Sequence, residues 1–241
     1  MTAAIFWGAF SSAALFLGQW LAKPLGRSER AIGLMMGFGG GTLLAAVAYE
    51  LIPERHIADG WQIIAWAMVG ALAYYVGDRY VDRGGGAART AVAPGKGEGG
   101  SGMAMFLGAL LDGIPEAFIL GLGLALGGQI SIAFLAAIFV SNVPQGLAGT
   151  TSLQEAGTSD RKITVMWALL TAACGVASGL GYLVADHLQN VGTYASAFAG
   201  GAVLMMLADS MIPESYRHGG RLTGLLTVVG FLVAGVLTVL Q

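Results

Sequence analysis

Two carboxylates flank a proline in the middle of a long apolar stretch of this chain. Asp112 and Glu116 lie on either side of Pro115 in the segment LLDGIPEAFILGLGL. Residues four apart share one face of a helix, so the two acids are expected to lie side by side. The proline also removes one backbone hydrogen bond and frees the carbonyl of Leu111. Oxygen donors gathered at one point are the ligands that divalent cations prefer.

A second proline later in the chain has polar neighbours of another kind. Ser141 and Gln145 are four residues apart around Pro144, and Asn142 lies between them in the segment SNVPQG. These side chains offer amide and hydroxyl oxygens in place of carboxylates. By position in their segments, both proline motifs are predicted to lie near the midplane of a membrane. The two sets of oxygen donors would then converge on one candidate site.

The elements that must hold these residues are predicted to be membrane-spanning helices. Of the 241 residues, 56% are hydrophobic and only 11% are charged, whereas a soluble domain has roughly a quarter charged residues. A helix crosses a bilayer with roughly 20 apolar residues. Eight stretches meet that requirement, at residues 2–21, 31–53, 61–77, 103–126, 130–151, 163–185, 192–213 and 222–240. The sequence predicts one all-α transmembrane domain over 1–241, with glycine-rich residues 78–102 as a flexible cytoplasmic loop.

The basic residues support this count of eight crossings. With the N-terminus outside, eleven of the twelve lysines and arginines fall on the cytoplasmic side, and only Arg55 lies outside. Cytoplasmic loops carry such an excess of positive charge. The prediction is a multi-pass protein of the cell membrane with both termini extracytoplasmic. Its net charge of −2 gives no basic field for a nucleic acid partner.

An internal repeat relates the second and seventh predicted helices. Residues 38–54, FGGGTLLAAVAYELIPE, match residues 198–214, FAGGAVLMMLADSMIPE, at 8 of 17 positions without a gap. The two helices are five crossings apart and therefore run in opposite directions. The sequence predicts three helices, a central pair and three inverted helices, a 3+2+3 bundle. Such inverted repeats are typical of secondary transporters.

The central acids have no counter-charge in the predicted bundle. No lysine or arginine lies inside any of the eight segments, and a carboxylate at the bilayer centre costs roughly 2.5 to 3.5 kcal/mol. A bound divalent cation would supply the missing charge beside Asp112 and Glu116. The alternative is that both acids are protonated and hydrogen-bonded within the bundle. Glu50, predicted to lie toward the outside, and Asp209, predicted to lie toward the cytoplasm, are further candidate ligands for an ion entering and leaving.

Other potential ligands are assigned ordinary roles. His56, His187 and His218 fall at predicted membrane interfaces, where a lone histidine is usually solvated. Cys174 is the single cysteine and lacks the spacing of a metal motif, so it is expected to be a small packing residue.

At the two proline motifs the chain resembles the ZIP family of divalent metal transporters. That family has eight helices in a 3+2+3 arrangement, extracytoplasmic termini and a variable loop between helices 3 and 4. Its fourth helix typically carries His-Asn-x-Pro-Glu-Gly, and its fifth a related motif around Pro-Glu-Gly or Pro-Gln-Gly. The corresponding segments here read DGIPEA and SNVPQG. The resemblance in topology spans the chain, whereas the motifs cover about a dozen residues.

The resemblance implies a role for each matching residue. Asp112 takes the place of the family's metal-binding histidine, and Glu116 matches its glutamate. Gln145 matches the acid or amide of the fifth helix. Asn142 takes a second-site ligand position. Gly113 replaces the family's asparagine.

A second departure is Ala117, where the family has glycine. Exchanging imidazole for carboxylate hardens a site and favours manganese, magnesium or iron(II), although zinc also accepts carboxylates. The function predicted is alternating-access transport of zinc, manganese, iron or a similar divalent ion, with no enzymatic activity and no cofactor. An ion channel, a ZIP-like transporter of a non-zinc substrate and a non-transporting regulator remain as alternatives. Glycine-rich helix faces are compatible with a homodimer in the lipid bilayer.

Overall fold

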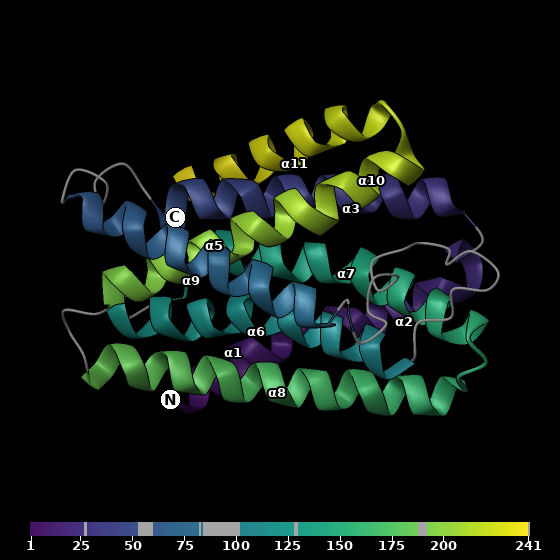
Figure 1. Cartoon of the computed structure of the whole chain (residues 1–241), viewed down its shortest axis with the longest axis horizontal. Coiled ribbons are helices and arrows are strands. Elements are labelled where there is room, and N and C mark those ends of the chain that lie inside the picture. Colours follow the sequence, from purple (N-terminus) through teal and green to yellow (C-terminus); the bar gives the residue numbers. More distant parts are fainter. Residues whose placement is uncertain are drawn as a thin grey trace.

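The chain folds into an all-helical bundle (Figure 1). The computed structural model describes residues 1–26, 28–52, 60–81, 83, 102–127, 130–187 and 192–240, and these ranges contain no strand. The elements in chain order are α1 (Thr2–Ser12), α2 (Ala14–Leu25), α3 (Glu29–Ala46), η1 (Val47–Leu51), α5 (Trp61–Val81), α6 (Gly102–Gly127), α7 (Ile132–Glu155), α8 (Asp160–His187), α9 (Gly192–Met206), η3 (Leu207–Met211), α10 (Ile212–Gly219) and α11 (Leu222–Val239).

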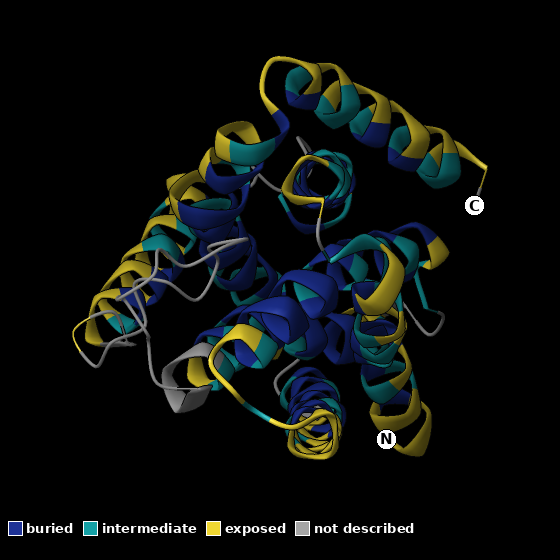
Figure 2. Cartoon of the chain, turned by 90° about the vertical axis from the view of Figure 1, so that its right-hand side faces the viewer, coloured by how far each residue is buried: buried dark blue, intermediate teal, exposed yellow. Residues whose placement is uncertain are grey.

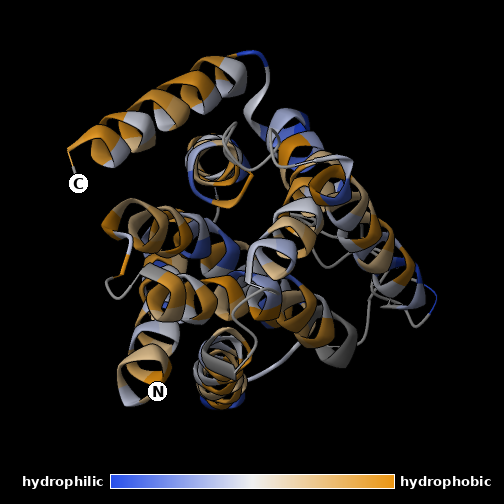
Figure 3. Cartoon of the chain, turned by 90° about the vertical axis from the view of Figure 1, so that its left-hand side faces the viewer, coloured by the Kyte–Doolittle hydropathy of each residue, from blue (hydrophilic) through white to orange (hydrophobic). Residues whose placement is uncertain are grey.

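Several of these elements join end to end into continuous helical spans, and seven spans of the described chain are long and apolar enough to cross a membrane. They run over Thr2–Leu25, Glu29–Leu51, Phe106–Leu126, Ile132–Glu155, Asp160–Ala185, Gly192–Gly219 and Leu222–Val239. The helix α5 has 21 residues but is not among these seven spans. Its tryptophans, tyrosines and Asp78 lower its mean hydropathy. Exposed residues lie on the outward sides of the helices (Figure 2), and hydrophobic residues cover much of the helices seen from the opposite end (Figure 3). Large hydrophobic side chains such as Trp20, Leu72, Val176 and Leu232 are exposed. An apolar exterior of this kind is suited to lipid, as in a membrane-embedded protein.

Most helix bounds agree with the predicted segments to within four residues, with three differences. The predicted segment 192–213 continues as helix to Gly219, six residues further. The helix α5 continues through Asp78 to Val81, so the predicted loop begins later than residue 78. The predicted first segment consists of two helices, α1 and α2, which meet at Ala13. Residues 84–101 of the predicted flexible loop, and residues 53–59 with Arg55 and His56, lie outside the described part of the chain.

We divide the helices into two groups. One, which we call the carboxylate body, contains α1, α2, α6, α7 and α8: α8 packs along α6 and α1, and α2 packs along α7. The other, the repeat body, contains α3, η1, α5, α9, η3, α10 and α11: α3 packs along α11, and α5 along α9. The boundary between the two bodies is formed mainly by α3 against α7 and by α9 against α6. The predicted site residues of α6 and α7 therefore lie on helices that line this boundary.

Glycines form two matching helix crossings in the repeat body. A Cβ atom on Gly41 of α3 would collide with the carbonyl oxygen of Thr227 on α11. A Cβ atom on Gly201 of α9 would collide in the same way with the carbonyl of Ala67 on α5. Gly201 follows Gly41 by 160 positions, and Thr227 follows Ala67 by 160 positions. The same backbone contact is thus made twice, and each time it joins a helix of one half of the repeat to a helix of the other.

A second pair of contacts obeys the same spacing. Gly230 on α11 approaches the carbonyl of Phe38, and Gly70 on α5 approaches the carbonyl of Phe198. Both members of the second half again follow those of the first by 160 positions. The repeat therefore extends beyond the 17 residues that match in sequence, through α5 and α11.

The two π-helical turns also lie at equivalent positions. The turn η1 covers Val47–Leu51 and η3 covers Leu207–Met211, again 160 positions apart. A π turn holds one extra residue compared with an α-helical turn and is common at functional sites. Along the long axis of the bundle, α3 and α9 run in opposite directions (Figure 1). The backbone thus repeats in detail, with the two copies inverted.

Both ends of the chain lie at the same end of the bundle (Figure 1). The described basic residues gather at the opposite end, on the helix ends that point there. They are Lys23, Arg30, Arg79, Arg83, Arg161, Lys162, Arg217 and Arg221, all exposed. This is the separation of charge from termini that the sequence predicted.

Candidate functional site

The helix α6 holds Asp112 and Glu116 inside the protein. The two side chains are 6% and 1% exposed, and α6 remains helical through Pro115 between them. Their four-residue spacing puts them one turn apart on the same side of the helix. No lysine or arginine of the described residues is buried. Two acids are therefore buried together without a buried basic residue.

Asp112 is held by a residue that no sequence pattern indicates. The hydroxyl of Tyr74, on α5, donates a hydrogen bond to Oδ1 of Asp112. Tyr74 is itself 4% exposed, and a buried tyrosine hydroxyl needs a polar partner. Tyr74 belongs to the repeat body and Asp112 to the carboxylate body. This hydrogen bond therefore crosses the boundary between the two bodies.

Glu116 is in a different situation from its neighbour. Both of its carboxylate oxygens are buried and have no hydrogen-bond partner within the described part of the chain. Burying an ionised carboxylate is expensive unless it is paired with an opposite charge. Glu116 therefore needs either a proton or a cation at this position.

Of the predicted ligands on α7, Ser141 and Asn142 are buried and act as hydrogen-bond donors. The Ser141 hydroxyl donates to the backbone oxygen of Ile138 at 2.9 Å. The Asn142 amide donates to the backbone oxygen of Ser11, on α1, at 3.4 Å. Gln145 is half-buried. Since amides and hydroxyls also carry acceptor lone pairs, the oxygens of these side chains retain the capacity to bind a cation.

The remaining two predicted ligands lie on the π turns. Glu50 in η1 is half-buried, and Asp209 in η3 is exposed. They occupy neighbouring rather than identical places in the repeat, because Asp209 is the counterpart of Tyr49. Among the described residues, no three histidine, cysteine or acidic side chains are grouped closely enough to bind a metal. The structure therefore leaves Asp112 and Glu116 as a pair, without Glu50 or Asp209 beside them.

Gly113 lies where a larger side chain would meet α8. A Cβ atom there would lie 3.1 Å from the Cys174 sulfur and 3.7 Å from Cδ2 of Leu170, both on α8. An asparagine at this position would thus push against α8. Cys174 is buried and is not part of a disulfide, which confirms the expected packing role.

His218 differs from the prediction of a solvated histidine. Its Nε2 lies 2.8 Å from a carboxylate oxygen of Glu214, and its Nδ1 lies 3.1 Å from one of Glu29. The histidine side chain is only 10% exposed. It joins α10 to the start of α3, a contact that sequence position alone could not indicate. The side chains of His187 and His56 are outside the described structure.

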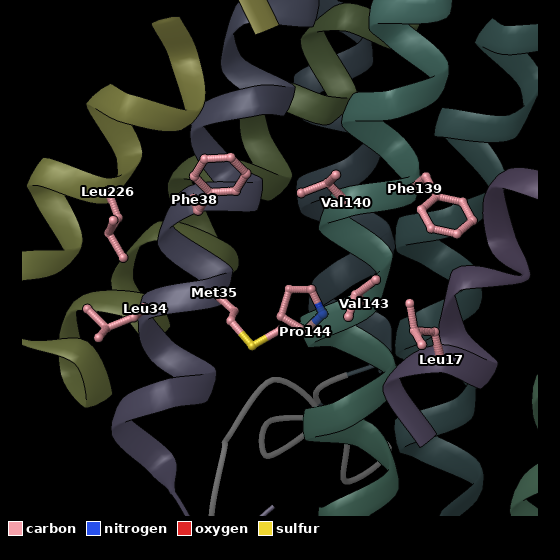
Figure 4. Close-up of a pocket in the computed structure, with 9 residues that line it drawn as sticks. All are labelled: Leu17, Leu34, Met35, Phe38, Phe139, Val140, Val143, Pro144 and Leu226. Atoms are coloured by element: carbon pink, nitrogen blue, oxygen red, sulfur yellow. The ribbon is translucent and has the colours of Figure 1, made fainter. Parts of the chain in front are cut away.

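An apolar groove lies on another side of α7. It has a volume of about 500 Å³ and lies between α2, α3, α7 and α11. Figure 4 shows side chains of the four helices around it, with Met35 and Phe38 of α3 facing Val143 and Pro144 of α7. None of the predicted ligands lines it. The groove is therefore separate from the carboxylate pair.

Comparison with known proteins adds no assignment. The sequence matches no protein-family model and no curated protein. The resemblance to the ZIP family therefore rests on the two proline motifs and on the topology predicted from the sequence.

Proposed function

We propose that this chain transports a divalent metal cation across the membrane, in the manner of the ZIP family that it resembles. The observation that carries the proposal is Glu116, a buried carboxylate whose oxygens have no hydrogen-bond partner among the described residues. Asp112 lies one turn away, and no buried lysine or arginine of the described chain balances the pair. A divalent cation is the ligand that would satisfy both acids at once.

The substrate ion would be held by oxygen atoms from two helices. Asp112 and Glu116 of α6 would supply charge, and Ser141, Asn142 and Gln145 of α7 would supply neutral oxygens. A site of this kind has no soft ligand, so it suits manganese or iron(II) and tolerates zinc. The ion is cargo and must leave again. A site with two charges and several weak donors is compatible with both binding and release.

The two bodies supply a physical basis for alternating access. We propose that the 3+2+3 arrangement holds, with α5 as the eighth crossing and the basic end in the cytoplasm. Sliding of the carboxylate body against the repeat body would expose the acids first to one side of the membrane and then to the other. The inverted repeat supports this, because it gives the framework two orientations of similar energy.

Glu50 and Asp209 would act outside the central site. Each lies on a π turn of the repeat body, and both are more exposed than Asp112 and Glu116. In the proposed orientation Glu50 faces the extracytoplasmic half and Asp209 the cytoplasmic half. They would attract the ion as it enters and leaves.

Uptake into proteoliposomes tests the proposal. The purified chain is reconstituted, and uptake of Mn²⁺, Fe²⁺, Zn²⁺ and Mg²⁺ is followed over a range of concentrations. We expect saturable uptake in which at least two of the ions compete, because one site serves them all. Flux that rises linearly without saturation would instead indicate a channel. Absence of flux for all four ions would refute transport of divalent metal.

A further inference from the structure

The hydroxyl of Tyr74 is the feature of the site that metal binding alone does not explain. Tyr74 lies on α5 in the repeat body, and its hydroxyl donates to Asp112 in the carboxylate body. Both side chains are buried, at 4% and 6% exposure. A hydrogen bond between groups shielded from water is not weakened by competing water, so it holds its partners together more firmly. The bond therefore ties a proposed ion ligand to the body against which it would have to move.

A second hydroxyl crosses the same boundary from the same half of the repeat. Thr42 of α3 donates to the backbone oxygen of Gly39 at 2.7 Å and lies 3.5 Å from that of Ala137 on α7. Thr42 is 4% exposed. The first half of the repeat thus contributes two hydroxyls at the boundary, one beside each central helix.

The second half of the repeat carries no hydroxyl at either equivalent position. The residues 160 positions after Thr42 and Tyr74 are Ala202 and Ala234. Both alanines are buried, each at 3% exposure, so they occupy comparable positions in the packing. Where α11 passes α7, the space between them forms part of the apolar groove, lined there by Leu226 (Figure 4). The repeated backbone is therefore symmetric, but its hydroxyl contacts with the carboxylate body are not.

We propose that Tyr74 is a latch that holds Asp112 against the repeat body and so favours one of the two access states over the other. This inference rests on the proposed transport function. A framework with exact inverted symmetry would have no preference between its two states. The bond from Tyr74 to Asp112, absent at Ala234, supplies one. Movement of the carboxylate body must break this bond before Asp112 is able to turn toward an ion beside Glu116.

The latch predicts a gain of affinity when it is removed. A ligand that binds only the unlatched state has its apparent affinity lowered by the fraction of protein in that state. A hydrogen bond to a charged group shifts such an equilibrium by about tenfold or more. The variant Tyr74→Phe removes the hydroxyl and keeps the ring. It should bind Mn²⁺ at least about tenfold more tightly than the unmodified chain, as measured by equilibrium dialysis of protein in nanodiscs.

A neighbouring tyrosine provides the control. Tyr75 is on the same helix but is exposed at 36%, and its hydroxyl accepts from Arg79 at 2.7 Å. The variant Tyr75→Phe makes the same chemical change away from Asp112, and it should leave Mn²⁺ affinity unchanged. Equal or weaker Mn²⁺ binding by Tyr74→Phe, with Tyr75→Phe unchanged, would overturn the latch.

A second measurement needs no metal and separates the latch from the transport function. Hydrogen–deuterium exchange of the metal-free protein reports how often α5 and α6 come apart. Tyr74→Phe should exchange faster in peptides from both helices, and Tyr75→Phe should match the unmodified chain. Unchanged exchange in Tyr74→Phe would overturn the latch even if metal binds. If the unmodified chain binds no metal, the proposed function fails, and the exchange rates alone then decide whether the latch exists.

Discussion

Residues 38–74 and 198–234 build the same framework twice, and the two copies treat the carboxylate body differently. Gly41 and Gly201 make matching backbone crossings, and a π turn occurs at the same place in each copy. In the first copy a tyrosine reaches Asp112, whereas the equivalent position in the second is Ala234. The comparison separates two roles within one repeat. Backbone contacts maintain the scaffold, and a few side chains decide how it engages the proposed site.

Removing the two acids of α6 should have the largest effect. Glu116→Gln and Asp112→Asn keep size and remove charge, so each should lower metal uptake by about a hundredfold or more, because even indirect ligand partners cost up to about a hundredfold. The melting temperature of Glu116→Gln in detergent should not fall, since the substitution removes a buried charge that has no hydrogen-bond partner among the described residues.

Glu155→Gln is the matched control for the acids. Glu155 is an exposed acid at the end of α7, and its loss should leave uptake unchanged. Normal uptake by Glu116→Gln would show that the carboxylate pair is not the ion site.

The scaffold role is tested by making the same substitution in both copies. Gly41→Ala and Gly201→Ala each force a methyl group into a carbonyl oxygen, so each should lower the free energy of unfolding by about 1–3 kcal/mol. Thermal unfolding in detergent measures both, and Gly123→Ala serves as control because a Cβ there meets no atom within 4 Å. If one of the two variants lost much of its unfolding free energy and the other lost none, the two crossings would not be structurally equivalent.

Thr42→Ala makes the first copy resemble the second at a single position. The hydroxyl bonds lost are intramolecular and buried, so the expected cost is about 0.5–1.5 kcal/mol of unfolding free energy. The substitution should also raise the exchange rate of amides in α7, which Thr42 approaches. Thr238→Ala, which loses a bond within α11 only, controls for removal of a helical hydroxyl. If the amides of α7 exchanged at the same rate in both variants, Thr42 would not contribute to the contact between α3 and α7.

The smallest effect is expected at the outer edge of the second copy. Tyr194 on α9 donates to Gln62 on α5 at 2.7 Å in an exposed position. The equivalent positions in the other pair of helices are Leu34 and Leu222, whose side chains have no group that could form such a bond. Tyr194→Phe should therefore change the unfolding free energy by no more than about 0.5 kcal/mol. A loss above that value, in the same thermal assay, would mean that the edge of α5 is held by this bond.

The sequence was informative where one-dimensional pattern determines structure. Apolar runs interrupted by charge predicted the spans well, because a bilayer requires a minimum apolar length. The match between residues 38–54 and 198–214 indicated the repeat, and the structure extends it to Gly70 and Gly230. The burial of Asp112 and Glu116 followed from their place within a long apolar segment.

Features that depend on contacts between distant helices could not be predicted. Tyr74 lies 38 residues before Asp112, and nothing in the sequence pairs a tyrosine of one span with an acid of another. His218 was expected to be solvated as a lone interfacial histidine, whereas its contact with Glu29 comes from the distant start of α3. The π turns were also missed, since one extra residue in a helix leaves the hydropathy pattern almost unchanged.

The glycine crossings have a consequence for how the two copies diverge. Where a Cβ would strike a carbonyl oxygen, the glycine carries a hydrogen atom that points at that oxygen, as in a weak Cα–H···O bond. Such a contact depends on backbone atoms and tolerates almost any neighbouring side chain. The surrounding positions are thus free to drift apart, as Thr42 and Ala202 have, while helix pairing is inherited intact. A duplicated scaffold of this type acquires asymmetric chemistry without having to redesign its architecture.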